Sequence, residues 1–302
     1  MYALCIACSN DNCIATNEYV QCRSCGSWNF ISDIATEDEN IKFYNDIYKE
    51  LDSINRSKLK KKIFNAFFDL DRKSKFESYE KFELFYKSLS SLQDPGKKVL
   101  EIGFGPGRTL SKLLDAGVNA FGIDISDTAV DNFQKKYPQY KEKVFVGNRF
   151  EARVDTIFCS ALFEHLENPT DFIVDASRSL ERDGCVIIDA LPCVNPMSSD
   201  LTVDDDVNFW KPFHKVIYSV EGIKRLFEKN GFELEKYGCL DIYNNRVLSL
   251  HISAGYSEIV KLRNSTFKSP GLPGIVKYYS LCRQATKIRS LALHSCFVFK
   301  KR

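Results

Sequence analysis

The sequence predicts an α/β protein with a doubly wound, mostly parallel sheet, preceded by a small cysteine-rich segment and helical additions. From residue 97 onward, short apolar runs alternate with amphipathic segments, as in parallel strands joined by helices. Gly103, Gly105 and Gly107 follow the first apolar run. Two Cys-x2-Cys pairs lie within the first thirty residues, a spacing typical of a metal-stapled segment.

Composition restricts the class of protein. The chain has 302 residues, of which 44% are hydrophobic and 27% charged, as in soluble globular proteins. The net charge of +2 gives no support for binding driven by nucleic-acid phosphates. No apolar run approaches the roughly 18–20 residues that span a bilayer, and "MYALCIACSNDNC" lacks the features of a secretory signal. We therefore expect a cytoplasmic protein with reduced cysteines.

Residues 1–30 are expected to form a zinc-binding knuckle. Cys5 and Cys8 form the first pair, and Cys22 and Cys25 form the second. Four thiolates can surround one Zn²⁺ ion and close its coordination sphere, so the ion would be structural. Iron is the alternative metal, and four free cysteines are the alternative without metal. Cys13 is off the pattern and is left out of the site.

Residues 31–96 are expected to form a helical lid or linker. Apolar residues recur at steps of three and four, which is the helical period. They are Ile41, Tyr44, Ile47, Tyr48, Leu51 and Ile54, and further on Phe82, Phe85, Leu89 and Leu92. The motif "LQDPG" at 92–96 ends the helix with a proline and a glycine.

Residues 97–302 carry the alternating pattern of the main domain. The expected strands are 98–104, 119–126, 143–148, 154–162, 185–192 and 295–302, and the expected helices are 108–117, 127–138, 171–184 and 220–231. The region of about 244–291, which includes "KSPGLPG", is expected to be an insertion ahead of the last strand.

The glycine loop "VLEIGFGPGRTL" (99–110) lies where an open α/β sheet binds its ligand. Its third glycine comes one residue too early for the dinucleotide fingerprint, and its ending does not match a phosphate loop. Glu101 suits an ammonium group, and Asp124, at the end of the second strand, suits both hydroxyls of a ribose. A ligand with an amino-acid end and a ribose is S-adenosylmethionine.

Four segments together resemble the Rossmann-like class I S-adenosylmethionine-dependent methyltransferases: "VLEIGFGPG", "FGIDIS", "VDTIFCSALFEHLENP" and "LERDGCVIIDALP". The resemblance covers about residues 97–240. It implies that Glu101, Gly103, Gly105 and Gly107 shape the methionine and ribose side of the pocket. It further implies that Asp124 holds the ribose, Ile125 packs on the adenine, Asn148 and Arg149 lie near the adenine amino group, and Ser160 and Ala161 line the methyl-transfer face.

The sequence says less about the methyl acceptor than about the methyl donor. The chain lacks the Asn/Asp-Pro-Pro-aromatic motif of base-amino methylation after the fourth strand. Residues 208–233 resemble a segment of methyltransferases of surface-polysaccharide and small-molecule biosynthesis. His214 is the candidate base or substrate contact and His165 is its rival, because a histidine near neutral pKa can take the proton of a hydroxyl.

Additional acceptor-side candidates follow from the same region. Phe209, Trp210 and Phe213 are candidates for an aromatic wall, and Asp204, Asp205 and Asp206 are a candidate metal-binding cluster for metal-assisted methylation. The alternative for the three aromatic residues is a place in the hydrophobic core. The alternative for the three aspartates is a solvated loop.

The expected function is methyl transfer to a hydroxyl, or a carbon, of a sugar, glycan or other small-molecule acceptor by in-line displacement. The first alternative is an RNA methyltransferase with an N-terminal zinc unit. The second is a protein that binds the cofactor or a partner without catalysis. Nucleic acid is not expected as a partner, and the oligomeric state is left open.

Overall fold

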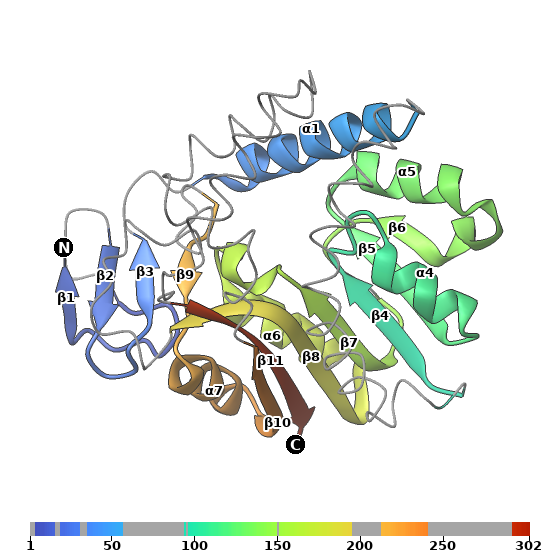
Figure 1. Cartoon of the computed structure of the whole chain (residues 1–302). Helices are drawn as coiled ribbons and strands as arrows, with labels where there is room; N and C mark the ends of the chain where they lie inside the picture. Colours follow the sequence, from blue (N-terminus) through green and yellow to red (C-terminus); the bar gives the residue numbers. More distant parts are fainter. Residues whose placement is uncertain are drawn as a thin grey trace.

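A seven-stranded sheet forms the centre of the chain (Figure 1), in the order β10-β11-β8-β7-β4-β5-β6. The computed structural model describes residues 4–15, 19–30, 35–56, 94, 96–149, 151–194, 213–240 and 292–302. The strands are β4 (Lys98–Ile102), β5 (Asn119–Asp124), β6 (Val144–Val146), β7 (Val154–Ser160), β8 (Leu180–Val194), β10 (Phe232–Leu240) and β11 (Ala292–Lys301). β11 runs antiparallel to both of its neighbours, and the ladders from β8 through β6 are parallel. The mostly parallel sheet is thus confirmed.

The strand order reverses between β4 and β7. β5 and β6 follow β4 on one side, whereas β7 and β8 lie on the other. In an open α/β sheet the crevice at such a reversal, beyond the carboxyl ends of the strands, is the ligand site. The reversal therefore places a binding crevice directly after β4.

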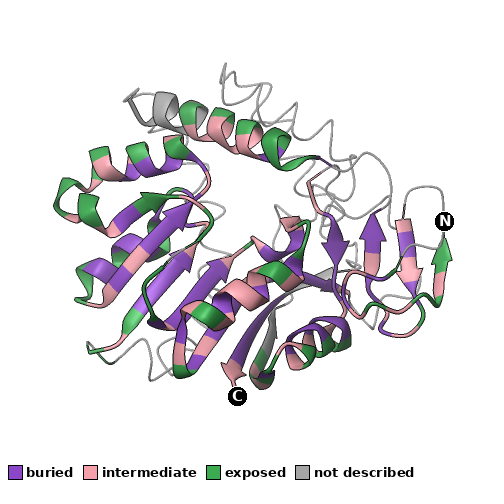
Figure 2. Cartoon of the chain, turned by 180° about the vertical axis from the view of Figure 1, so that it is seen from behind, coloured by how far each residue is buried: buried purple, intermediate pink, exposed green. Residues whose placement is uncertain are grey.

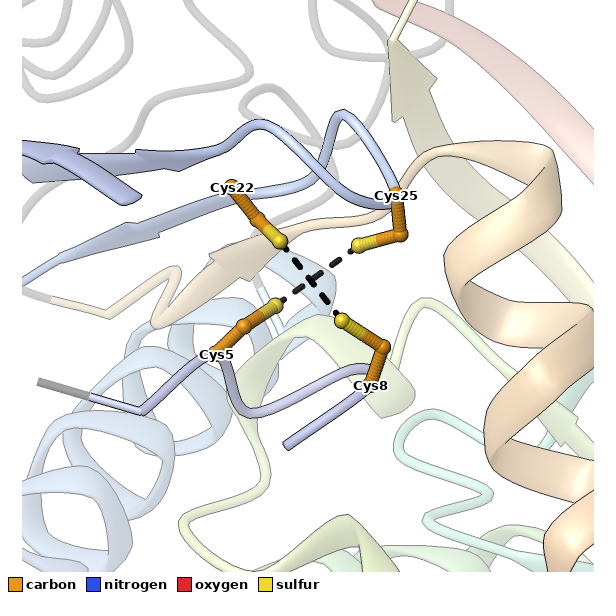
Figure 3. A group of neighbouring side chains, drawn as sticks. All are labelled: Cys5, Cys8, Cys22 and Cys25. Carbon is orange, nitrogen blue, oxygen red and sulfur yellow. Dashed lines mark hydrogen bonds between the residues drawn. The ribbon is translucent and has the colours of Figure 1, made fainter. Parts of the chain in front are cut away.

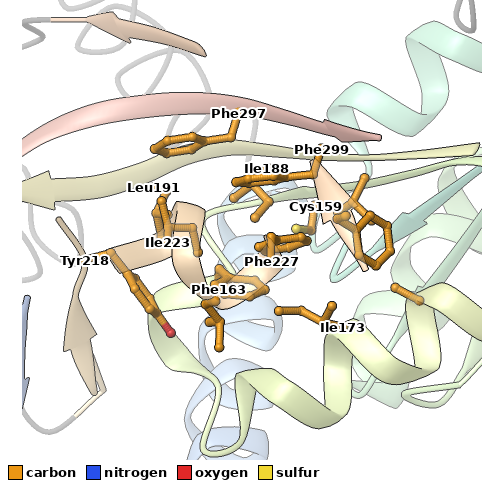
Figure 4. Close-up of a cluster of buried hydrophobic side chains, with 14 of the residues drawn as sticks. Cys159, Phe163, Ile173, Ile188, Leu191, Tyr218, Ile223, Phe227, Phe297 and Phe299 are labelled. Atoms are coloured by element: carbon orange, nitrogen blue, oxygen red, sulfur yellow. The ribbon is translucent and has the colours of Figure 1, made fainter. Parts of the chain in front are cut away.

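Helices cover both faces of the sheet. α4 (Arg108–Asp115) and α5 (Asp127–Lys136) pack in one hydrophobic cluster with Val99, and α6 (Pro169–Ser179) and α7 (Val220–Lys229) pack in another with Leu100. Val99 and Leu100 are neighbours in β4, so their side chains point to opposite faces. Figure 4 shows the second cluster, where the rings of Phe227 and Phe299 stack at 3.9 Å. Figure 2 shows the buried strands between the half-exposed helices.

One predicted helix ends earlier than expected. The sequence predicted a helix over 171–184, but α6 ends at Ser179 and β8 begins at Leu180. Leu180 pairs with Val154 of β7, and Nζ of Lys301 donates to the carbonyl oxygens of Ser177 and Leu180 at 2.6 and 3.1 Å. Strand pairing and capping from β11 therefore override the helical pattern here.

The N-terminal segment shares a second sheet with the main domain. This sheet has the order β1-β2-β3-β9, with β1 (Cys13–Ala15), β2 (Tyr19–Cys22), β3 (Trp28–Phe30) and β9 (Val216–Ile217). Trp28 pairs with Ile217 and Asn29 pairs with Val216. The division of the chain at residues 30 and 96 stays a prediction, but the first segment is joined to the main domain by strand pairing.

Helix α1 (Glu37–Arg56) follows this segment and extends toward α5 (Figure 1). Two short 3₁₀ helices, η1 (Pro138–Lys143) and η2 (Phe163–His165), complete the described elements. None of the helices in this part of the chain has both the length and the apolar character required to cross a membrane. The predicted helix over 82–92, the acidic cluster 204–206, Phe209, Trp210 and the whole insertion 244–291 lie outside the described residues.

Candidate active site

The loop between β4 and α4 depends on its glycines. Gly103, Gly105 and Gly107 have φ angles of +69°, +51° and +66°, a region that side-chain-bearing residues avoid. A Cβ at Gly107 would lie 2.2 Å from Cδ2 of Phe133, and one at Gly105 would lie 2.7 Å from Oη of Tyr48. The backbone of the loop can therefore approach its neighbours only because these side chains are absent.

Asp124 fastens this loop to the end of β5. Its Oδ2 accepts the N–H of Gly105 and its Oδ1 accepts the N–H of Ser126, both at 2.8 Å. The carboxyl is 5% exposed, and burial raises its pKa although the two hydrogen bonds oppose this shift. Since a carboxylate can accept about four hydrogen bonds, Asp124 keeps acceptor capacity for a ligand.

Glu101 is a buried carboxyl beside the loop. It is 4% exposed, and its Oε2 has no hydrogen-bond partner among the described residues. Burial, followed by the charges of Asp124 and Asp189, raises the pKa of Glu101 to about 8. A buried carboxylate is costly without a partner, so the site is suited to a ligand that brings a positive charge.

A pocket of about 430 Å³ opens beside the glycine loop. Of the predicted site residues, those on its lining are Glu101, Gly103, Gly105, Ser160, Ala161, His165 and His214. The lining does not include Gly107, Asp124, Ile125, Asn148 or Arg149. Gly107 instead faces Phe133, and Arg149 is exposed and pairs with Asp175 at 3.1 Å.

Helix α1 supplies pocket residues that the sequence analysis did not assign to the site. Tyr44 and Tyr48 line the pocket, and burial, with the charge of Asp124, raises the pKa of Tyr48. Asn45 accepts a hydrogen bond from the hydroxyl of Ser126, and the carbonyl of Tyr48 accepts one from Nδ2 of Asn132 at 3.2 Å. Tyr44 and Tyr48 belong to a helical repeat of apolar residues that the sequence shows. Such a repeat does not reveal which part of the fold its apolar face contacts.

Glu164, His165 and His214 form a second group of polar side chains on the lining, here called the Glu–His–His cluster. Nδ1 of His165 lies 3.0 Å from the carbonyl oxygen of Phe213, so the Nδ1–H donates to it. Burial lowers the pKa of His165 to about 4, which keeps the ring neutral. The two predicted histidines are thus brought together, with ring centroids 4.7 Å apart, and Glu164 was not foreseen.

Of the three residues predicted to form an aromatic wall, Phe213 is among the described residues, whereas Phe209 and Trp210 are not. Phe213 stacks on Phe43 of α1, with ring centroids 4.0 Å apart, so this aromatic residue joins the loop before β9 to α1.

Cys5, Cys8, Cys22 and Cys25, the four-cysteine cluster, converge on one point (Figure 3). The Sγ atoms of Cys5 and Cys25 are 3.7 Å apart, and those of Cys8 and Cys22 are 3.5 Å apart. A tetrahedral zinc–thiolate site with bonds of about 2.3 Å has sulfur–sulfur separations of about 3.8 Å. The cluster therefore has the dimensions of a zinc site, and Cys13 is not one of its members.

The cysteine-rich segment is hydrogen-bonded to the segment that bears His214, and the hydroxyl of Ser219 donates to the carbonyl of Cys25. The N–H of Ser219 donates to Oγ of Ser27 at 3.0 Å, and the N–H of Phe30 donates to the carbonyl of Lys215 at 2.9 Å. The N–H of Lys215 in turn donates to the carbonyl of Glu164 at 2.8 Å. The cysteine-rich segment therefore supports one wall of the pocket.

Comparison with known proteins identifies the family. A family model described as a methyltransferase domain matches residues 75–237, which is more than half of the chain, so the chain belongs to this family. The two relatives described next are themselves named as methyltransferases.

Two relatives illustrate the similarity. A protein of Mycolicibacterium smegmatis named "Probable S-adenosylmethionine-dependent methyltransferase" is 27% identical over 162 residues, covering 52% of this chain and 60% of the relative. The ubiquinone biosynthesis O-methyltransferase of Actinobacillus pleuropneumoniae is 26% identical over 154 residues, covering 47% of this chain and 59% of the relative. The matches thus span about three-fifths of these relatives.

Similar solved structures support the fold. The [4+2]-cyclase SpnF has a TM-score of 0.56 at 13% identity, covering 90% of this chain and 98% of that chain. The mycolic acid cyclopropane synthase CmaA1 has a TM-score of 0.50 at 19% identity, covering 69% and 83%. The activities for which these two proteins are named differ, so the fold alone does not define the reaction.

Proposed function

We propose that this enzyme transfers the methyl group of S-adenosylmethionine to a hydroxyl oxygen of a small-molecule acceptor of the sugar, glycan or phenol class. The observation that carries the proposal is the buried Glu101 carboxyl beside the glycine loop, with Oε2 unpartnered among the described residues. S-adenosylmethionine carries an ammonium and a sulfonium, and buried carboxylates are stabilised by such charges. Similarity to a named O-methyltransferase supports oxygen as the atom methylated.

Each side of the pocket has a role in this proposal. Glu101 pairs with the ammonium group, Asp124 accepts the ribose hydroxyls, and Tyr44 and Tyr48 of α1 exclude water above them. Ser160, whose hydroxyl donates to Asp189 at 3.3 Å, and Ala161 border the reacting methyl group. Positioning and desolvation of this kind supply most of what an in-line displacement requires.

The adenine contacts form a separate part of the proposal. Ile125 is half-buried and Asn148 and Arg149 are exposed, all close in sequence to the ends of β5 and β6. We assign them to the adenine side of the cofactor, at the outer rim of the site.

The proton of the acceptor hydroxyl is proposed to leave at the Glu–His–His cluster. S-adenosylmethionine supplies an electrophilic methyl group, whereas His165 and His214 offer groups that can orient and deprotonate the hydroxyl. The cluster lies on the same lining as Ser160 and Ala161, so an acceptor placed against it can also reach the methyl group.

The proposal includes a structural zinc ion in the four-cysteine cluster. The sulfur–sulfur separations support it, and all four cysteines are free of disulfide bonds. An ion held by four thiolates has no open position for substrate, so its role is to fix β3 and, through β3, the segment from Lys215 to Ser219.

A donor-labelled screen tests the proposal. The protein is incubated with methyl-labelled S-adenosylmethionine and panels of nucleotide sugars, free sugars, phenols and RNA, and the product is analysed for a new O–CH₃ group. We expect label in a hydroxyl-bearing small molecule, and in parallel micromolar binding of S-adenosylhomocysteine. Label in RNA alone, or binding of NADH without binding of the adenosyl ligand, would overturn the proposal.

A further inference from the structure

The Glu–His–His cluster has the composition and spacing of a metal site. One ligand atom from each of Glu164, His165 and His214 lies within 4.8 Å of the others. Glu164 and His165 come from η2, and His214 comes from the segment before β9. Residues nearly fifty positions apart thus converge on one point of the pocket lining.

Glu164 provides an independent indication of a cation. It is 2% exposed, and Oε2 accepts no hydrogen bond from any described residue. Its Oε1 lies 3.8 Å from Nε2 of His165. A carboxylate buried in this way is costly without a partner, so the site is suited to a cation placed between Glu164 and the two imidazoles.

His165 is oriented as metal-binding histidines are. Its Nδ1–H donates to the carbonyl of Phe213, so a neutral ring keeps its lone pair on Nε2, which lies 3.8 Å from Oε1 of Glu164. A hydrogen bond from the other ring nitrogen to a carbonyl is the usual means by which proteins fix a metal-binding imidazole. The nearby ammonium of Lys215 is paired with Glu167 at 2.8 Å.

We propose that Glu164, His165 and His214 bind a divalent first-row transition-metal ion on the acceptor side of the pocket. Two imidazoles and one carboxylate favour iron, cobalt or zinc over magnesium or calcium. Because all three side chains line the pocket, an ion held by them would lie on the wall of the space proposed for the acceptor. The inference rests on the proposed function and revises one step of it: with the ion bound, both imidazoles are ligands, so the acceptor proton leaves to water and not to a histidine.

With such an ion, the atoms and electrons of the methyl transfer are all accounted for. An ion held by Glu164, His165 and His214 would lower the pKa of an acceptor hydroxyl beside it, and the proton of that hydroxyl would pass to water. The oxygen then forms a bond to the methyl carbon while the S–CH₃ bond breaks, and its electron pair stays on sulfur. The sulfonium becomes a neutral thioether, and no oxidant or reductant is needed.

Cobalt titration of the full-length protein tests the site separately from activity. The four-cysteine cluster is first filled with Zn²⁺, and Co²⁺ is then added while visible absorption and metal content are measured. We expect one further ion per chain, with bands of nitrogen and oxygen coordination and without thiolate charge-transfer bands. The additional ion should be lost in Glu164→Gln and in His214→Ala.

Asp189→Asn is the matched control, because Asp189 is a neighbouring carboxylate that lies outside the cluster. This variant should still bind the second ion, and binding of S-adenosylhomocysteine reports that each variant is folded. Absence of a second ion in the wild type, or its retention in both cluster variants, overturns the inference. Methylation of a hydroxyl without the ion rejects the inference alone, whereas ion binding without methylation of any hydroxyl acceptor rejects the proposed function alone.

Discussion

The carboxylate of Asp124 accepts the main-chain N–H of Gly105 at 2.8 Å and so ties the end of β5 to the glycine loop after β4. The same carboxylate accepts the N–H of Ser126, whose side chain caps α5 by accepting the N–H of Ala129. One side chain therefore holds the loop, the strand end and the helix start together. Its replacement should affect both cofactor binding and local stability.

Asp124→Ala is expected to weaken binding of S-adenosylhomocysteine by roughly 10–100-fold, because hydrogen bonds to a charged group contribute about 1.5–3 kcal/mol. Calorimetric titration measures this affinity. Asp124→Asn should lie between the wild type and Asp124→Ala, since the amide keeps one acceptor oxygen. Asp127→Ala, at an exposed position in the next turn, serves as control. Unchanged affinity in Asp124→Ala would contradict the ribose assignment.

Gly107→Ala should be much more destabilising than Gly117→Ala. Both residues have positive φ angles, +66° and +80°, so both substitutions incur a left-handed backbone cost of about 1–2 kcal/mol. Only at Gly107 would the new Cβ overlap Phe133, at 2.2 Å, whereas nothing lies within 4 Å at Gly117. Overlap of this kind adds about 1–3 kcal/mol. Urea denaturation measures the difference, and equal losses would show that Phe133 can move aside.

Much of the main domain could be predicted because its signals are local. Apolar runs, helix periods and the glycines after β4 lie within short windows of sequence, and the structure contains the corresponding strands and helices. Asp124 and Glu101 could be selected because they stand at the ends of such runs. The end of α6 could not be predicted, because it depends on pairing of Leu180 with Val154 and on contacts from Lys301.

The remaining features depend on contacts between distant segments. β9 has two residues, and its pairing with β3 joins positions about 190 apart in the sequence. No local sequence pattern therefore predicts this strand. Tyr48 was recognised as part of a helical repeat, but its contact with the glycine loop depends on where α1 packs. Glu164 reads as an ordinary charged residue, and only the folded chain reveals its burial.

Cys22→Ser should remove the zinc ion and loosen the pocket wall. We expect the zinc content of the four-cysteine cluster to fall from about one ion per chain to near zero, because three thiolates hold the ion much less tightly than four. Since Phe30 and Ser27 are hydrogen-bonded to Lys215 and Ser219, the KM for the acceptor should rise more than the Kd of S-adenosylhomocysteine. Cys13→Ser is the control and should retain its zinc, and iron in place of zinc would correct the metal assignment.

The stability of the ligand-free protein should depend on pH through Glu101. Its pKa is raised from 4.5 to about 8 in the folded state, by burial first and then by Asp124 and Asp189, so the fold binds this proton more tightly than the unfolded chain does. The associated stabilisation is complete below about pH 4.5 and is lost as the pH rises through about 8. Thermal unfolding should therefore show a steeper fall in Tm between about pH 5 and pH 8 in the wild type than in Glu101→Gln. Glu164 shifts in the same direction, so the variant should keep part of the slope.

Cofactor binding should reverse this protonation. The ammonium of S-adenosylhomocysteine favours the ionised form of Glu101, so binding at pH 7 should release a proton. Calorimetry in two buffers with different ionisation enthalpies measures that release, which should disappear in Glu101→Gln together with much of the affinity. Glu142→Gln, at an exposed carboxylate, should release the same proton as the wild type. If Glu101→Gln also released it, the ammonium would have to be paired with another group in the pocket.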